Sequence, residues 1–539
     1  MITLWLRDQF AGQRLEHETQ QYLQRLRQAP VLRSQNAATD LMRRLHRQPP
    51  PHVRLGETTW GEAVVVPLTE LVKACGLITG GMGSGKTMFA LLPARAIIQR
   101  LPSLGTVSCG AIDPKGELFD RMLYLLAARI QELHGRERQE LLERLVIIDF
   151  SNRTAISSYN ILNCPPDADA DFFISSRLET LRELLPASER PSVPATTVLR
   201  NAIALLVEAG RPAPDIGRLL SDSDFRQQLA ARSRNPEVRS YFQRLFAEVP
   251  KQTIGALRSR FDALFASDSV RLALSGSTAP DFRRLQNEGK IVLINCSGPM
   301  ITRGVRLLLQ SLVLSDIRQA IFARPNNPPV TYVWICDEAQ NFFLTRQQQE
   351  DMTDVLTMAR SFGSFFWFLC QNLTTSIADA RIVEQLHTNI RWSLTLRGTP
   401  RDAQFLRPAL PVTGRFQRPE PRPFRESTVY SIEEERALLL DGIAHLPDRA
   451  AYLWLKARSG EAIKLRTESL EFPQGEEFRQ AVAELRDEPA LGARVSRAEY
   501  ARQIAERDRK WRGEPEQQSG PIEDRWEKAY RQQEALWRT

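Results

Sequence analysis

The chain has 539 residues, of which 42% are hydrophobic and 25% charged, so it is long enough for two or three domains with a large core. Its net charge of +8 and pI near 9.3 favour an anionic partner only mildly, because an arginine-rich solvated surface gives the same balance. No apolar run reaches the roughly 18 residues that span a bilayer, and the N-terminus lacks a signal-peptide core, which argues against a membrane-spanning or secreted protein.

The six cysteines show no C-x-x-C pairing and lie mostly in apolar, strand-like runs, where cysteine behaves as a small buried side chain. The six histidines show no metal-ligand spacing. These patterns predict a cytoplasmic chain with reduced thiols and no structural metal.

Residues 1–53 form the first predicted unit, a basic helical arm rich in glutamine and arginine that contains a run of three prolines near its end. Two interpretations of this arm stay open. It could bind a partner, DNA or an acidic membrane surface, or it could pack on its own domain.

Residues 79–87 read TGGMGSGKT and match the phosphate-binding pattern G-x-x-x-x-G-K-[ST] without a mismatch. An apolar strand is expected before the loop and a helix after it, at 88–100, which is the context that such a loop requires. Lys86 should reach the β- and γ-phosphates of ATP, and Thr87 should hold Mg²⁺. The other expected nucleotide contacts are Gly80, Gly81, Met82, Gly83, Ser84, Gly85 and Met88. A glycine-rich turn beside an unrelated lysine is the alternative, and it is disfavoured because only nine of the 72 basic residues are lysines.

Strands alternate with helices on both sides of a long helical stretch. Strands are expected at 62–67, 107–113, 145–150, 290–295, 330–336, 364–370, 390–396, 451–457 and 461–466. The helices of this part are expected at 88–100, 118–144, 304–322 and 432–442. Such alternation predicts an α/β fold with a mostly parallel, doubly wound sheet.

This pattern divides the chain after the arm into four predicted units. A first part of the sheet domain at 54–164 is followed by an inserted all-α domain at 165–286 and by the second part of the sheet domain at 287–473. The last unit, 474–539, is a charged helical tail with a few aromatic residues. It is expected to dock on a partner or on the body of the protein, with disorder as the alternative.

The strand expected at 330–336 ends directly in Asp337 and Glu338. Doubly wound sheets bind ligands at the carboxyl ends of their strands, and a carboxylate pair there is the second half of a phosphate-loop ATPase site. We therefore expect Asp337 to bind Mg²⁺, usually through water, and Glu338 to polarise the attacking water.

Two polar residues at other strand ends are further candidates. Gln371 follows the strand at 364–370 and would face the γ-phosphate, as a sensor or by orienting water, if that strand lies beside the one ending in Asp337. Lys115 lies in the sequence DPKGE after the strand at 107–113, where it could neutralise phosphate or respond to nucleotide. An ordinary polar strand end and a tight turn are the simpler interpretations of these two residues.

Arg360 precedes the strand at 364–370 and could act across a subunit boundary as an arginine finger, which stabilises charge on the transferring phosphoryl group. Arg391 and Arg397 are competing candidates, since arginine is abundant throughout the chain.

These motifs together resemble the FtsK/HerA superfamily of phosphate-loop ATPases, and within it the TraG/TraD-type coupling ATPases of conjugation and type IV secretion. The resemblance covers roughly residues 54–470. It rests on elements that occur in the same order, namely the phosphate loop at 80–87, DPKGEL at 113–118, YNIL at 159–162, GKIVLINCSG at 289–298, WICDEAQNF at 334–342, ARSFG at 359–363 and Gln371.

The resemblance implies a RecA-like ATPase that uses ATP and Mg²⁺ and assembles into a ring, usually a hexamer, with DNA passing through its pore. It also implies that Arg360 or a nearby arginine completes the neighbour's site and that Gln371 is the sensor. The inserted helical domain would receive DNA or substrate. Membrane-anchored members begin with transmembrane helices, which this sequence lacks, so contact with the inner membrane would need a partner bound to residues 1–53 or to the tail.

Three functions remain open at this stage. The first is an ATP-driven, DNA-stimulated translocase or coupling ATPase. The second is a secretion-machine ATPase that handles proteins. A cytosolic HerA-like ATPase of a mobile element or defence system is a further alternative to the coupling ATPase. The third is a nucleotide switch that assembles partners, which the presence of Glu338 disfavours.

Overall fold

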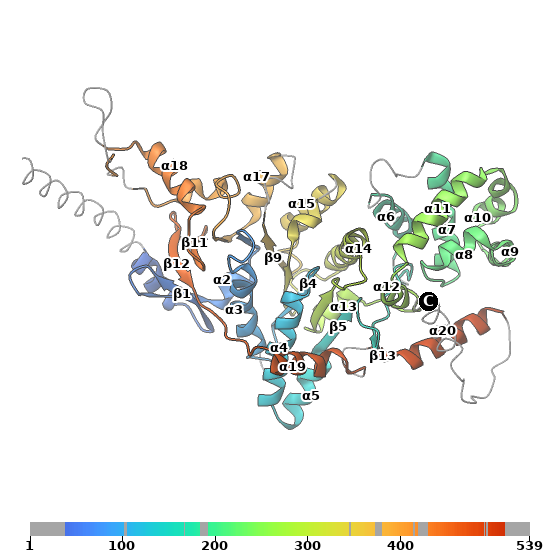
Figure 1. The fold of residues 1–539 in the computed structure, drawn as a ribbon, viewed down its shortest axis with the longest axis horizontal. Coiled ribbons are helices and arrows are strands. Elements are labelled where there is room, and N and C mark those ends of the chain that lie inside the picture. The colour runs from blue at the N-terminus through green and yellow to red at the C-terminus, as the bar shows by residue number, and fades with distance from the viewer. Residues whose placement is uncertain are drawn as a thin grey trace, which may run out of the picture.

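The computed structural model describes residues 38–101, 105–165, 168–183, 192–343, 346–371, 380–412, 416–418, 429–489, 491 and 494–512. A single 11-stranded sheet runs through the larger part of the molecule, in the order β2-β1-β12-β11-β10-β3-β9-β8-β4-β7-β5 (Figure 1). Helices pack against this sheet, and a separate group of helices lies at its β5 end (Figure 1). The predicted α/β fold with a mostly parallel sheet and a helical insertion is confirmed.

The parallel part of the sheet extends from β10 to β5, and every neighbouring pair within it is parallel. Its strands are β10 (Trp392–Thr395), β3 (Gly76–Thr79), β9 (Ser364–Cys370), β8 (Thr331–Cys336), β4 (Val107–Asp113), β7 (Ile291–Asn295) and β5 (Leu145–Asp149). All residues of β4, β7 and β9 are buried, as expected for strands that are covered on both faces.

The other end of the sheet is antiparallel and joins the two ends of the sheet domain. β11 (Ala450–Leu455) pairs with β10, and β12 (Ile463–Thr467) pairs with β1 (His52–Thr58), which pairs with β2 (Ala63–Pro67). β1 was not expected from the sequence, which predicted the first strand of the sheet domain only at 62–67; His52 and Val53 fall in the predicted arm and the rest of β1 in the predicted sheet domain. Residues 38–46 are helical and bury Leu41 and Leu45 in the main core, so this part of the arm packs on its own domain. The rest of the arm, residues 1–37, lies outside the described residues.

The helices around the sheet are α2 (Leu68–Val72), α3 (Lys86–Ile98), α4 (Glu117–Glu132), α5 (Gly135–Arg144), α14 (Arg303–Phe322), α15 (Arg346–Met358), α17 (Ala380–Asn389) and α18 (Ile432–Ile443). The four helices predicted around the sheet are present, one of them divided in two, and α2, α15 and α17 were not expected. The stretch predicted as one helix at 118–144 is two helices, because Leu133 and His134 adopt extended backbone conformations between α4 and α5.

The segment between β6 (Ala155–Ile156) and β7 contains helices and loops and no strand among its described residues. Its helices are α6 (Ala170–Glu183), α7 (Val193–Glu208), α8 (Asp215–Ser221), α9 (Ser223–Arg232), α10 (Pro236–Ser240), α11 (Lys251–Leu264), α12 (Asp268–Leu274) and α13 (Phe282–Asn287), with a short π-helical turn at Tyr241–Leu245. Most of them form a compact group beyond the β5 edge of the sheet (Figure 1). The exact boundaries of the units, at 164, 286 and 473, remain a prediction.

The C-terminal strap, which we define as the described residues from 475 to 512, crosses from the sheet to the helical insertion (Figure 1). α19 (Glu476–Arg486) packs along α4. β13 (Val495–Ser496) then pairs with β6, and α20 (Arg497–Arg512) lies against the insertion. The described part of the tail is therefore helical and docked on the body, while residues 513–539 lie outside the described residues.

Two further expectations concern the whole chain. Within the described ranges, no helix combines the length and the apolar character needed to cross a membrane. Each of the six cysteines is a free thiol, and all but Cys164 are buried.

Candidate nucleotide-hydrolysis site

The phosphate loop connects the end of β3 to the start of α3, as the sequence predicted. Gly85 is the N-cap of α3 with φ of 106°, a conformation that favours glycine, and it offers no side chain to cap the first N–H groups of the helix. Lys86 Nζ donates to the carbonyl oxygens of Gly80 and Gly81 at 2.8 and 2.9 Å, and Ser84 Oγ donates to Gly81 O at 2.8 Å. A glycine-rich turn with uncapped N–H groups and a lysine folded over it fits the phosphates of a nucleotide.

Met82 and Met88 stay predicted nucleotide contacts, which would be made through their backbone. Met82 is exposed at the tip of the loop. Met88 Sδ contacts the guanidinium of Arg121 on α4, so its side chain faces the neighbouring helix rather than the loop. Thr87 occupies the first turn of α3, next to Lys86.

Asp337 and Glu338 follow β8, which is separated from β3 only by β9. Since these strands are parallel, the phosphate loop and the two carboxylates lie at the same edge of the sheet. Burial raises the pKa of Asp337 to about 7, and the charges of Asp113 and Glu338 add to the rise. Burial lowers the pKa of Lys86, while the charges of Asp337 and Glu338 oppose that shift. A cation held between Thr87 and Asp337 would offset the unfavourable charge of the buried carboxylate.

Glu338 has an unusual backbone and a fully engaged carboxylate. Its φ is 48°, which is rare for a residue other than glycine and is a kind of local strain found at functional sites. Its Oε1 accepts hydrogen bonds from Lys115 Nζ and from Gln371 Nε2, the latter at 2.5 Å, and its Oε2 accepts one from Gln340 Nε2. Gln340 was missed from the sequence, although it lies two residues after Glu338 in WICDEAQNF.

The DPKGE turn holds Lys115 in place for this contact. Asp113 is fully buried, and its two oxygens accept from Lys115 N at 2.7 Å and from Phe119 N at 2.8 Å, which ties the turn to the start of α4. Burial raises the pKa of Asp113, while these backbone hydrogen bonds lower it. Gly116 has φ of 91°, and a Cβ at this position would lie 2.6 Å from Ser297 Oγ, so both the conformation and the space require glycine.

The three arginine-finger candidates lie at two different edges of the sheet. Arg397 follows β10 beside the phosphate loop, where its carbonyl oxygen accepts from Gly81 N at 2.6 Å and its guanidinium pairs with Asp448 at 2.9 Å. Arg360 and Arg391 precede β9 and β10, so they lie at the opposite edge, away from the chain's own Lys86 and Glu338.

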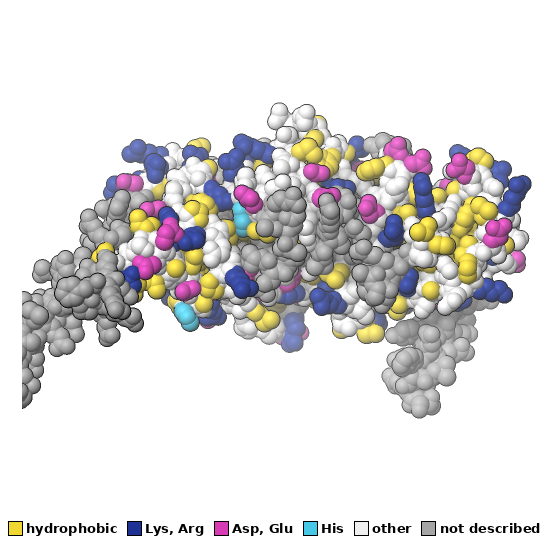
Figure 2. Space-filling view, turned by 90° about the horizontal axis from the view of Figure 1, so that it is seen from above, with side chains coloured by type: hydrophobic (Ala, Val, Ile, Leu, Met, Phe, Trp, Pro, Cys, Tyr) yellow, Lys and Arg dark blue, Asp and Glu magenta, His cyan; other side chains and the backbone are white. Residues whose placement is uncertain are grey.

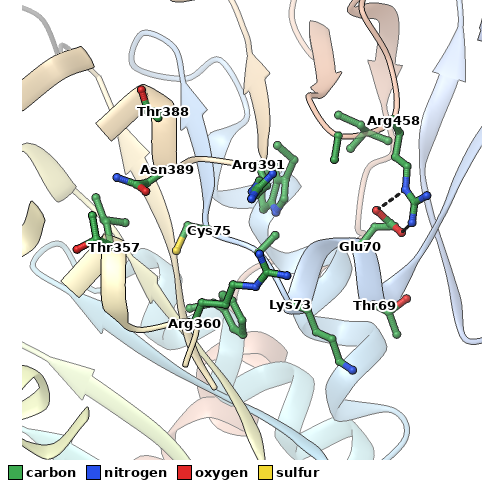
Figure 3. A pocket seen from close by; sticks show the side chains of 16 residues that line it. Thr69, Glu70, Lys73, Cys75, Thr357, Arg360, Thr388, Asn389, Arg391 and Arg458 are labelled. Carbon is green, nitrogen blue, oxygen red and sulfur yellow. Dashed lines mark hydrogen bonds and ion pairs between the residues drawn. The ribbon is translucent and has the colours of Figure 1, made fainter. Parts of the chain in front are cut away.

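Arg360 and Arg391 line a cavity of about 570 Å³ together with Lys73, which follows α2 (Figure 3). A fourth cation in this cavity, Arg458, is held by Glu70 through hydrogen bonds of 3.1 and 2.6 Å (Figure 3). The side chains of Lys73, Arg360 and Arg391 are exposed, and none of the three forms an ion pair with any carboxylate in the described part of the chain. This cavity therefore has an excess of positive charge.

Another residue near the phosphate loop was not foreseen. Arg449 has φ of 66°, and its Cγ lies 3.7 Å from the position that a Cβ of Gly85 would occupy. No pattern in the sequence distinguishes it from the many other arginines.

No protein-family model matches the sequence, and no curated protein does. Among solved structures, the trigonal form of the bacterial conjugative coupling protein TrwBΔN70 in complex with sulphate matches with a TM-score of 0.50 and 14% identity, over 85% of this chain and 95% of that one. The two chains share one fold. At this identity the likeness establishes the fold alone, and that fold is the one that the sequence resemblance implied.

Two other solved structures are similar to this chain with lower scores. TrwB in complex with ADP and Mg²⁺ has a TM-score of 0.48 and 15% identity, over 85% of this chain and 95% of that one. VirB4 of Thermoanaerobacter pseudethanolicus has a TM-score of 0.45 and 13% identity, over 78% of this chain and 98% of that one.

Proposed function

We propose that this protein is a Mg²⁺-dependent ATPase. The observation that carries the proposal is the meeting of the phosphate loop with Asp337 and Glu338 at one edge of the parallel sheet. The loop amides and Lys86 would bind the phosphates, and Thr87 and Asp337 would hold Mg²⁺, which when bound neutralises the charge that develops on the phosphoryl oxygens. Glu338 would accept a hydrogen bond from the attacking water, and Gln371 would orient that carboxylate.

We further propose that ATP hydrolysis drives DNA movement, as in a coupling ATPase of conjugation or type IV secretion. The fold shared with a conjugative coupling protein supports this assignment, and so does the net charge of +8. Figure 2 shows Lys and Arg side chains at both ends of the elongated molecule, interspersed with Asp and Glu, so the positive charge is spread rather than gathered into one patch on this face. Arg232, Arg234, Arg239 and Arg244 of the insertion are candidate contacts for DNA, with a solvated face as the better interpretation of them.

The active form would be a ring of six identical subunits, in which the cavity at the opposite sheet edge meets the neighbour's phosphates. Its surplus cations, Lys73, Arg360 and Arg391, support this arrangement because they have the charge that a transferring phosphoryl group requires. Contact with a membrane or secretion partner would involve residues 1–53 or the tail at 474–539.

The experiment is a measurement of ATP hydrolysis with and without single- and double-stranded DNA. Lys86→Ala and Glu338→Gln should each reduce kcat by about 100-fold or more, because each removes a group that acts on the phosphates or the water. Lys464→Ala is a matched control, since Lys464 lies on β12 and stacks on Tyr452, away from the site. Hydrolysis that is independent of DNA would leave the ATPase assignment standing and refute the DNA-driven one. A protein-handling ATPase would then be the better assignment.

A further inference from the structure

The carboxylate of Glu338 accepts hydrogen bonds from three side chains on different elements. Lys115 follows β4, Gln371 follows β9, and Gln340 belongs to the 3₁₀ turn after β8. A carboxylate whose two oxygens are both engaged, one of them by an ammonium group, is a weak acceptor for the proton of a water molecule. The geometry of this site therefore holds Glu338 in a state that is poorly suited to activate water.

Lys115 is the donor most able to leave. Its backbone is fixed by Asp113, but its side chain is 42% exposed and consists of a flexible four-carbon stem. Gln371 and Gln340 are shorter and neutral, so an incoming anion attracts them less. Lys115 follows β4, which is parallel to β3, so it lies at the same edge of the sheet as the phosphate loop.

A bound nucleotide would compete with Glu338 for this ammonium group. The terminal phosphate of ATP has more negative charge than one carboxylate, and it would lie at the edge of the sheet where β3, β9, β8 and β4 end. ADP lacks that phosphate, so with ADP bound Lys115 would keep its contact with Glu338.

We propose that Lys115 is a nucleotide-responsive positioning residue, which binds Glu338 in the absence of a terminal phosphate and transfers to the γ-phosphate when ATP binds. The transfer frees Glu338 Oε1 to accept a proton from the attacking water. After hydrolysis and release of phosphate, Lys115 binds Glu338 again, and the carboxylate is once more a weak proton acceptor. This inference rests on the proposed ATPase function. It adds that the γ-phosphate itself makes Glu338 available as a base, by binding Lys115.

The test compares the affinities of Mg²⁺–ADP and of a Mg²⁺-bound non-hydrolysable ATP analogue for the wild type and for Lys115→Met, which keeps the length of the stem and removes the charge. We expect binding of the ATP analogue to weaken about 10- to 100-fold, the range of a charge-assisted contact, and binding of ADP to change less than about threefold. Lys115→Arg should restore most of the lost affinity because it restores the charge. Lys464→Met is the matched control and should change neither affinity.

Two results would overturn the inference. Equal weakening of both nucleotides would make Lys115 an ordinary phosphate ligand, and unchanged affinities with a lower kcat would make it a fixed support of Glu338. Thermal unfolding of Lys115→Met should match that of the wild type, because the side chain is 42% exposed, and this result would exclude misfolding. Failure of the wild type to bind either nucleotide would refute the proposed function itself, and is thus distinguishable from both results.

Discussion

Gln371 Nε2 donates a hydrogen bond of 2.5 Å to Glu338 Oε1 and so joins the ends of the neighbouring parallel strands β9 and β8. Because this bond orients the carboxylate expected to activate water, Gln371→Ala should lower kcat by about 10- to 100-fold and change the affinity for a non-hydrolysable ATP analogue less than threefold. Steady-state kinetics and nucleotide titration measure the two quantities.

Gln340→Ala is the matched comparison, since Gln340 donates to the other oxygen of the same carboxylate. A larger loss of kcat in Gln371→Ala than in Gln340→Ala would support a role of Gln371 at the γ-phosphate. Equal losses would mean that both amides only support Glu338.

Arg360 lies at the opposite sheet edge from its own phosphate loop, so any role in hydrolysis must be exerted on a neighbouring subunit. Arg360→Ala alone should bind ATP normally and hydrolyse it about 1,000-fold more slowly. Mixing Arg360→Ala with Lys86→Ala should restore activity, because in a random ring about a quarter of the interfaces pair an intact Lys86 with an intact Arg360.

The same mixing experiment with Arg391→Ala identifies which cation of the cavity acts. Restored activity with Arg391→Ala but not with Arg360→Ala would assign the role to Arg391. If neither mixture exceeds the sum of its components, the cavity does not complete a neighbouring site.

Much of the candidate site could be predicted because its chemistry lies in short, local patterns. TGGMGSGKT needs only its own glycines and lysine, and an apolar run ending in Asp337 and Glu338 marks the carboxyl end of a buried strand. The adjacency of β9 to β8 could be stated only as a condition, because the order of strands depends on how distant segments pack.

The contact between Lys115 and Glu338 could not be predicted for the same reason. It joins residues 223 positions apart through the side-by-side packing of β4 and β8. β1 was missed because its burial alternates with exposed polar residues on a strand near the edge of the sheet, so it reads as a polar segment. The strap was left open between docking and disorder because polar side chains anchor it to the body, for example Arg486 through Asp149 at 2.8 Å, and hydrophobic periodicity does not report such contacts.

His387 should make stability depend on pH. Burial, with the charge of Lys456, lowers its pKa to about 4, and its ring stacks on Phe405 at 4.4 Å. Since the folded state binds a proton less readily than the unfolded state, the stabilising contribution is present above about pH 6.5 and is lost as the pH falls towards 4. The loss is at most about 3 kcal/mol.

The measurement is denaturant unfolding between pH 7 and pH 4 for the wild type and His387→Phe. Phenylalanine keeps the stacking and cannot take up a proton, while the carbonyl oxygen of residue 387 still accepts from Lys456. The free energy of unfolding should fall more steeply with acid in the wild type. Parallel curves for the two proteins would contradict this origin of the pH dependence.

Arg486 anchors the C-terminal strap to the sheet edge that carries the candidate site. Its Nε donates to Asp149 Oδ2 at 2.8 Å and its Nη2 to Ser151 Oγ at 2.9 Å, and the Asp149 side chain is fully buried. Arg486→Ala leaves that buried carboxylate without this charged partner and should lower the free energy of unfolding by about 2–3 kcal/mol. Arg479→Ala is the matched control, because Arg479 lies on the same helix and pairs only with exposed Glu476 among the described residues.

The strap continues from Arg486 to the helical insertion, where Tyr500 Oη donates to Leu272 O at 2.7 Å and Arg211 Nη1 to Asp508 Oδ1 at 2.8 Å. Loosening its anchor should therefore raise hydrogen exchange in α12 and α20 more than in α3. If the strap transmits motion between the two parts, Arg486→Ala should keep basal ATP hydrolysis and lose its stimulation by DNA. If Arg486→Ala shows the same hydrogen exchange and the same DNA stimulation of ATP hydrolysis as Arg479→Ala, the strap does not position the insertion.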